Sequence, residues 1–354
     1  MHANFLIVGA GAVGLTSALE LLQAGYRVTL VERGRVGEEA SWAGGGILSP
    51  LCPWHYTEPV TRLALRGMAR FGDACTALHG TTGVDPEYQR SGMLLLPPMQ
   101  DELAANWCEQ HQFPVRRVAV GDFLPEAAGD GLLLPEVAQV RNPRLLRALR
   151  RRVEMLGGVI LERQEVQTLQ SRGDEIVALH TTQGVLSADA YIVTAGAWSK
   201  KLLGEYALNI DVRPIRGQIL LFKFSGPPFP HILLQQDLYL IPRHDGHVLV
   251  GSTLEDVGFD RSTTAAARTH LLQRLYEIFP AWKNIAPIQH WAGLRPGSPD
   301  NIPTIGRHPV MTNLYANLGH FRYGITMSWA SAELLRNTIE NKPQPFVSES
   351  YRWR

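Results

Sequence analysis

The sequence predicts an α/β protein in which a parallel sheet with helices is joined to an α+β domain with a mainly antiparallel sheet. Three features lead to this prediction. The chain opens with an apolar strand, a glycine-rich turn and a helix, a buried strand near 190–194 also ends in a glycine turn, and shorter alternating strands occupy much of the remaining sequence. At 354 residues the chain exceeds what one hydrophobic core usually serves, so two packed domains are expected.

The first strand is the apolar run 4–8, which leads directly into Gly9-Ala10-Gly11-Ala12-Val13-Gly14 and then a helix over 15–23. This spacing, G-x-G-x-x-G between a strand and a helix, is typical of Rossmann-type dinucleotide-binding units. Gly9 permits the tight turn, Gly11 lets a pyrophosphate approach the backbone, and Gly14 lets the helix pack closely on the strand. The first amides of that helix are expected to face the diphosphate.

A second strand over 27–31 presents Glu32 at its end, 18 residues after Gly14. An acidic side chain at this place accepts hydrogen bonds from the ribose hydroxyls and repels a 2′-phosphate, which disfavours NADP. These residues do not distinguish NAD from FAD, because both present the same adenosine diphosphate end.

Later segments favour a flavin. Small side chains over 39–47 would let backbone amides approach a flat cofactor, although a flexible loop explains the same composition. A helix is predicted from Asn142, as N-cap, and Pro143 to about 156, and its arginines are interpreted as a solvated face. Strands are predicted over 158–169, 175–182 and 190–194. A buried strand that returns after an intervening segment suits a flavin domain built from separated pieces, whereas a second nicotinamide half would alternate strand and helix regularly.

Four sequence blocks resemble the glycine oxidase and D-amino-acid oxidase family of FAD-dependent flavoproteins. They are Gly9–Gly14 with Glu32, Trp-Ala-Gly-Leu-Arg-Pro-Gly at 291–297, Gly-His-Phe-Arg-Tyr-Gly-Ile at 319–325, and Leu-Tyr-Leu-Ile-Pro-Arg at 238–243. The likeness covers nearly the full length and is strongest to the bacterial glycine oxidases of thiazole (thiamine) biosynthesis. It implies a Rossmann-type FAD-binding domain, an antiparallel substrate domain and a homotetramer.

The resemblance also implies which residues bind the cofactor, a non-covalent FAD. These are Gly9, Gly11, Ala12, Val13, Gly14, Glu32, Arg33, Ala40, Ser41, Gly45, Gly46, Ile47, Val166, His320, Phe321, Arg322, Tyr323, Gly324, Ile325 and Thr326.

The expected substrate-binding residues are Arg295, Arg322 and Tyr239. A guanidinium is the best clamp for an amino acid's carboxylate because its planar fork matches both oxygens, and Arg295 is the first choice. On the sequence alone, a surface position is the favoured explanation for Arg295 and strand packing the favoured explanation for Tyr239. The family resemblance is what assigns both residues to the substrate. No side chain is required as acid or base, since the flavin accepts the hydride, and His320 is assigned to the flavin rather than to a base.

The implied activity is oxidative deamination of glycine, sarcosine and small D-amino acids. The products are glyoxylate or another oxo acid, ammonia and hydrogen peroxide. The alternative is a dehydrogenase that passes the electrons to a quinone or carrier. Three departures from the family pattern bear on substrate preference: Gly44-Gly45-Gly46, Leu254 and Tyr323.

Composition limits the partners. A formal net charge of +1 argues against nucleic acid. Three scattered cysteines and the absence of a histidine cluster argue against a disulfide framework or a bound metal and fit the cytoplasm. The apolar start is too short to span a membrane and is broken by glycines. The expected partners are a small amino acid and oxygen.

The expected domains are discontinuous. The FAD-binding domain is assigned to 1–85, 140–208 and 293–345, the substrate-binding domain to 86–139 and 209–292, and a C-terminal tail to 346–354. Strands are expected near 92–96, 218–224, 238–242 and 248–252, with a helix near 263–279. The chain from Lys342 onward is expected to be loosely held because it is rich in proline and polar residues.

Overall fold

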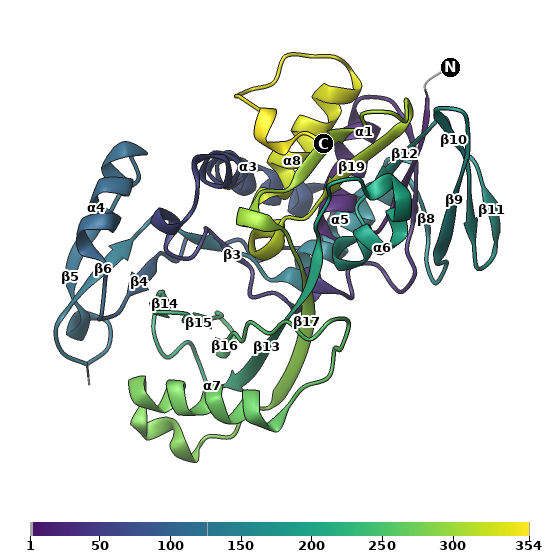
Figure 1. Ribbon diagram of the computed structural model, residues 1–354. Coiled ribbons are helices and arrows are strands. Elements are labelled where there is room, and N and C mark those ends of the chain that lie inside the picture. Colours follow the sequence, from purple (N-terminus) through teal and green to yellow (C-terminus); the bar gives the residue numbers. More distant parts are fainter. Residues whose placement is uncertain (1–2, 126, 354) are drawn as a thin grey trace.

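The computed structural model describes residues 3–125 and 127–353 and contains two large sheets (Figure 1). The first has six strands, in the order β18-β19-β12-β1-β2-β8. Their bounds are Thr304–Arg307, Leu314–Leu318, Ala190–Val193, Asn4–Val8, Arg27–Val31 and Val159–Leu161. All neighbours pair in parallel except β18 with β19, so the predicted parallel sheet is confirmed.

Both faces of this sheet are covered, which explains its nearly continuous apolar strands. Four helices pack together on one face: α1 (Ala12–Gln23), α3 (Glu58–Thr82), α5 (Asn142–Met155) and α8 (Gly324–Ile339). The other face carries α6 (Ser199–Leu203) and a three-stranded sheet of β9 (Val166–Arg172), β10 (Glu175–Thr181) and β11 (Gly184–Leu186). Along β1, Phe5 and Ile7 face the four helices, whereas Leu6 and Val8 face the three-stranded sheet.

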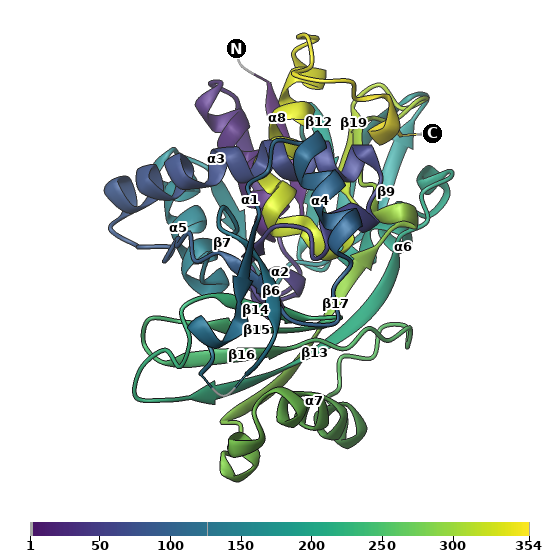
Figure 2. The ribbon, with the colours of Figure 1, turned by 90° about the vertical axis from the view of Figure 1, so that its left-hand side faces the viewer.

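The second large sheet has eight strands, in the order β17-β13-β16-β15-β14-β4-β6-β5. Their bounds are Gln289–Gly297, Arg213–Lys223, His247–Gly251, Leu238–Pro242, Ile232–Gln235, Met93–Leu95, Asp130–Leu134 and Arg116–Ala119. All pairs are antiparallel except β14 with β4, so the expected mainly antiparallel sheet is confirmed. Helix α7 (Ala265–Ile278) packs on one face, seen below the strands in Figure 2, and α4 (Asp101–Gln110) on the other.

Short elements connect the two parts. They are α2 (Ala40–Ala43), β3 (Ile47–Leu48) and β7 (Ala138–Gln139), of which β3 and β7 pair with each other. The domain boundaries given above remain a prediction. Strand β17 runs continuously across the boundary expected between residues 292 and 293. None of the helices described here is long and apolar enough to cross a membrane.

Two local predictions were wrong. The single strand expected over 158–169 is two strands, β8 and β9, in different sheets, because the chain turns between them with Arg163 at φ 56°. Asn142 is the first residue of α5 rather than its N-cap. Its side-chain amide instead donates to the backbone oxygens of Ser41 (2.7 Å) and Gly44 (2.9 Å). The side chain therefore bonds to a loop distant in sequence instead of capping its own helix.

The C-terminal tail also differs from its prediction, because its last turn is anchored by two aromatic side chains. Tyr351 is 1% exposed and donates its hydroxyl to the backbone oxygen of Pro59 at 2.7 Å. Trp353 is 5% exposed and packs edge-on against His308, with ring centres 4.7 Å apart. Burial of two large rings outweighs the polar composition of the segment that leads to them.

Candidate active site

A cavity of about 490 Å³ lies at the carboxyl ends of β1, β2 and β12 and extends to β15 and β17. Strand β1 has β2 on one side and β12 on the other, so the chain reverses its winding direction here. Ligands of open α/β sheets bind at such a switch point. The cavity thus lies between the parallel sheet and the antiparallel sheet.

The glycine turn forms one wall of the cavity. Gly9 has φ 109°, and a Cβ there would lie 2.6 Å from the backbone oxygen of Thr194. Gly11 precedes α1 and lines the cavity. Gly14 is the one predicted cofactor residue outside the lining. A Cβ on Gly14 would lie 2.0 Å from the oxygen of Gly9, so its role is the close packing of the helix on the strand.

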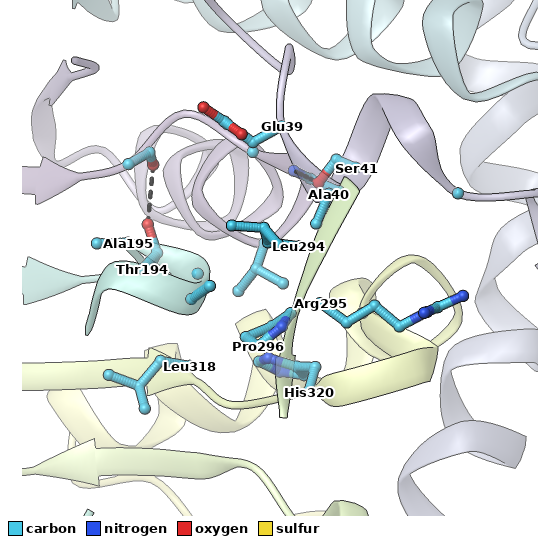
Figure 3. Close-up of a pocket in the computed structure, with 18 of the residues that line it drawn as sticks. Glu39, Ala40, Ser41, Thr194, Ala195, Leu294, Arg295, Pro296, Leu318 and His320 are labelled. Atoms are coloured by element: carbon cyan, nitrogen blue, oxygen red, sulfur yellow. Dashed lines mark hydrogen bonds between the residues drawn. The ribbon is translucent and has the colours of Figure 1, made fainter. Parts of the chain in front are cut away.

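The start of α1 is held in place by side chains from other elements. The backbone N–H of Ala12 donates to Ser41 Oγ at 3.0 Å. Thr194 Oγ1 donates to the oxygen of Gly9 at 2.8 Å. A hydrogen bond of Thr194 is dashed in Figure 3. The first N–H groups of a helix have no acceptor within the helix, so this wall presents donors and the positive end of a helix dipole. It suits a diphosphate.

Glu32 follows the end of β2 and is buried. Its two carboxylate oxygens accept from the backbone N–H groups of Ala10 and Gly34, each at 2.9 Å. Burial raises the pKa of Glu32, while these two hydrogen bonds act in the opposite direction. The carboxylate is therefore oriented by backbone donors and retains lone pairs for ribose hydroxyls.

Arg33 and Trp198 form a stacked pair beside Glu32. The Arg33 guanidinium carbon lies 3.4 Å from the centre of a Trp198 ring, and the guanidinium pairs with Glu39 at 2.5 Å. All three residues line the cavity. Trp198 and Glu39 were not assigned to the site from the sequence. The glycine turn that precedes Trp198 was the signal for it, since turns at the ends of parallel strands face the switch point.

The remaining predicted cofactor residues also line the cavity, although their contacts with FAD remain predictions. They are Gly11, Ala12, Val13, Arg33, Ala40, Ser41, Gly45, Gly46, Ile47, Val166, His320, Phe321, Arg322, Tyr323, Gly324, Ile325 and Thr326. Further lining residues that the sequence analysis did not assign to the site include Asn142, Gln164, Thr194, Asn317 and Leu318.

His320 is 2% exposed and precedes the short turn Phe321–Tyr323 and helix α8. Burial lowers its pKa to about 3, so the imidazole is neutral at neutral pH. Its Nε2 atom, like Asn142 Oδ1 and Asn317 Oδ1, is buried without a hydrogen-bond partner in the described part of the chain. All three residues line the cavity, as expected where a polar ligand completes the site.

Arg295 projects from β17 on the side opposite Leu294 (Figure 3). Its terminal nitrogens donate to the backbone oxygen of Thr253 at 3.1 Å and to Ser252 Oγ at 2.6 Å. Burial lowers the pKa of Arg295, and a hydrogen bond with Tyr239 opposes that effect. The structure thus places Arg295 and Tyr239 together at the cavity wall.

Arg322 faces the same part of the cavity, where its positive charge acts on Arg295. It is hydrogen-bonded to Tyr56, whose hydroxyl contacts that of Tyr323. The two tyrosine rings are perpendicular, with centres 5.1 Å apart, and burial raises the pKa of Tyr323 well above its usual value. All three predicted substrate-binding residues therefore lie at one end of the cavity.

The three departures from the family pattern have different outcomes. Gly44, Gly45, Gly46 and Tyr323 line the cavity. At Gly45, a Cβ would lie 2.6 Å from Ile241 Cδ1, so a larger residue would displace the wall beside Tyr239. Leu254 is 57% exposed and lies outside the lining, so the expectation that it bears on substrate preference through the pocket was wrong.

Comparisons with known proteins agree with this geometry. Residues 4–338 match the family described as FAD dependent oxidoreductase. The chain is 40% identical to glycine oxidase of Pseudomonas aeruginosa, over 98% of this chain and 97% of that one. It is 31% identical to the bifunctional protein ThiO/ThiG of Synechocystis, over 98% of this chain and 53% of that one. The solved structure of glycine oxidase from Geobacillus kaustophilus superposes with a TM-score of 0.93 at 26% identity, covering 99% of each chain.

Proposed function

This chain belongs to the FAD dependent oxidoreductase family, and we propose that it is an FAD-dependent amino-acid oxidase of the glycine oxidase type. The proposal rests mainly on one observation. A single cavity connects a glycine turn and the carboxylate of Glu32, at one end, with two arginines and a tyrosine at the other. The first end suits the adenosine diphosphate of FAD, and the second suits a small carboxylate.

The residues present fit FAD. The start of α1 would hold the diphosphate, Glu32 the ribose hydroxyls, and the start of α8 with His320 the flavin end. When bound, FAD supplies the two-electron acceptor for the substrate's α-C–H bond. A helix N-terminus at the flavin end also favours negative charge there.

Arg295 would orient the substrate by its carboxylate. Two of its donors are already directed to Thr253 and Ser252, which fixes the guanidinium plane and leaves further N–H groups for both carboxylate oxygens. Tyr239 adds a hydroxyl at the same wall. Fixed orientation is the main catalytic contribution expected from a protein whose cofactor performs the chemistry.

The amine needs no dedicated base at this end of the cavity. The positive charges of Arg295 and Arg322 lower the pKa of a substrate ammonium beside them, which favours the neutral amine that the reaction requires. His320 is already neutral and buried, so it is a weak proton acceptor.

The electron acceptor and the biological setting belong to the same proposal. We propose oxygen as the acceptor, with release of ammonia and hydrogen peroxide, in a cytoplasmic homotetramer that serves thiazole (thiamine) synthesis. The likeness to a ThiO/ThiG protein supports the pathway, and the family resemblance supports the assembly. Light scattering on the purified protein measures the oligomer directly.

The experiment is a stoichiometric assay with glycine in air-saturated buffer. We expect one oxygen consumed for each ammonia, glyoxylate and peroxide formed. Glycine-dependent reduction of an artificial quinone without peroxide would instead establish the dehydrogenase alternative. An FAD-loaded protein that transforms neither glycine, sarcosine nor D-alanine with any acceptor would refute the proposed activity.

A further inference from the structure

Arg295 and Arg322 are both without an acidic partner in the described residues. Arg295 donates to a backbone oxygen and a serine hydroxyl. Arg322 contacts Tyr56, and its polar neighbours include Tyr323, Tyr239 and the thiol of Cys52. The strongest influences on the pKa of each guanidinium are burial, neighbouring tyrosines and, for Arg295, the charge of Arg322; none of these is an aspartate or glutamate. This end of the cavity therefore carries two positive charges.

Two other buried arginines have acceptors within the protein for their terminal nitrogens. Arg216, 4% exposed, pairs with Glu255 and Asp260, each at 2.6 Å. Arg243, 5% exposed, donates to three oxygens, on Gln139, Val140 and Gly45, at 2.6 to 2.9 Å. Arg322 differs because its neighbours are phenols and it faces the cavity.

The acidic residues that line the cavity do not neutralise this charge. Glu32 is held by the backbone N–H groups of Ala10 and Gly34, and Glu39 is paired with Arg33 and Arg261. The third acidic lining residue, Glu165, directly precedes β9 and, in the part of the chain that the structure describes, forms no ion pair with Arg295 or Arg322. One carboxylate of a bound amino acid would neutralise one of the two guanidinium groups. A second cation enclosed without a partner is unfavourable, so the site is complementary to a second anion.

We infer that Arg322, oriented by the Tyr56–Tyr323 pair, forms a subsite for a second carboxylate, and that the preferred substrates are amino acids with two carboxylates. This inference rests on the proposed function. Arg295 binds the carboxylate next to the oxidised carbon, and Arg322 binds the other, attached either to the nitrogen, as in iminodiacetate, or to the α-carbon, as in D-aspartate. Tyr56 is a positioning residue that acts through Arg322.

The reaction balances for both attachments. Iminodiacetate, oxygen and water give glycine, glyoxylate and hydrogen peroxide: the C–H bond loses two electrons to the flavin and then to oxygen, and water cleaves the resulting C=N bond. D-aspartate, oxygen and water give oxaloacetate, ammonia and hydrogen peroxide by the same steps.

The test measures binding without turnover. Oxydiacetate has the shape of iminodiacetate but no amine to oxidise, and methoxyacetate lacks its second carboxylate. Both are titrated against the FAD-loaded protein and followed by the flavin absorbance. We expect oxydiacetate to bind roughly 10- to 100-fold more tightly, the range of a charge-assisted hydrogen-bonded contact and well above the statistical factor of about two.

Variants assign the preference to its residues. Arg322→Met should reduce the oxydiacetate preference to about the statistical factor, Arg322→Lys should retain part of it, and Tyr56→Phe should lower it. Arg307→Met, an exposed arginine on β18, is the matched control and should keep it. Equal binding of the two acids by the parent protein would overturn the inference, as would an unchanged preference in an FAD-loaded Arg322→Met protein.

Turnover distinguishes the two attachments. Iminodiacetate is compared with N-ethylglycine and D-aspartate with D-2-aminobutyrate, so that each pair differs mainly in the acid group. A higher kcat/KM for either diacid than for its monoacid partner supports the inference and identifies the attachment. If neither diacid has a higher kcat/KM than its partner, the inference is overturned. A protein that no amine reduces would refute the proposed function, while the binding ratio would still test the subsite.

Discussion

Replacing Arg295 with methionine removes the positive charge and the planar fork while keeping much of the side-chain volume. In the structure this guanidinium already donates to Thr253 and Ser252, so its plane is fixed before substrate arrives. Of its five N–H groups, these contacts use two, and the rest remain for Tyr239 and the substrate carboxylate. The variant loses both the attraction and the orientation.

The expected loss follows from these contacts. Truncating one partner of a buried, hydrogen-bonded charge pair costs about 2–5 kcal/mol, and the upper part of that range applies to a bidentate contact inside a cavity. At about 1.4 kcal/mol for each factor of ten, we expect kcat/KM for glycine to fall by roughly 100- to 4000-fold. FAD binding should change little, because the glycine turn and Glu32 lie on other elements.

The assay is anaerobic reduction of the bound flavin over a range of glycine concentrations, with FAD content measured on the same sample. Arg295→Lys, which keeps the charge and loses the fork, should be intermediate, and Arg307→Met should behave as the parent protein. Parent-like flavin reduction by glycine in Arg295→Met would remove Arg295 from the mechanism.

Three further predictions concern positions that the structure makes informative. Gly217→Ala should weaken glycine binding at least tenfold with FAD retained, because a Cβ there would lie 2.1 Å from an Arg295 nitrogen; parent-like kinetics would refute this contact. Between pH 7.5 and 5.5, the free energy of unfolding measured by chemical denaturation should fall in the parent protein by about 1 kcal/mol more than in His320→Gln. The parent loses stability as the pH falls below about 6.5, because the imidazole binds a proton in the unfolded chain but stays neutral in the folded protein, where its pKa is near 3. Parallel curves of unfolding free energy against pH for the two proteins would contradict this. Tyr351→Ala should lower the unfolding free energy by about 3–5 kcal/mol through loss of a buried ring and its bond to Pro59, and an unchanged denaturation midpoint would show that the tail is not anchored.

The parallel half of the fold was predictable because its signals are local. The strands 4–8 and 27–31, the turn at Gly9 and the carboxylate at Glu32 follow one another in a short segment whose geometry is fixed by glycine conformations and apolar periodicity. The two arginine blocks could be located because they belong to a family pattern. Composition and spacing alone left Arg295 as a possible surface residue.

The parts of the fold and site that the sequence did not predict depend on contacts between segments far apart in the chain. The stacking of Arg33 on Trp198 and the bond from Asn142 to the loop at Ser41 join residues that no local pattern connects. The same holds for Tyr56, whose contact with Tyr323 spans more than half the chain. The tail was predicted wrongly because Tyr351 is buried by a helix near the other end of the sequence.

The most direct test of the central claim is the visible spectrum of the purified protein, supplemented with FAD and freed of oxygen. We predict a flavin absorbance that bleaches when glycine is added and returns when air is admitted. A protein that takes up no FAD, or whose flavin spectrum is unchanged by glycine, sarcosine and D-alanine, would contradict the account.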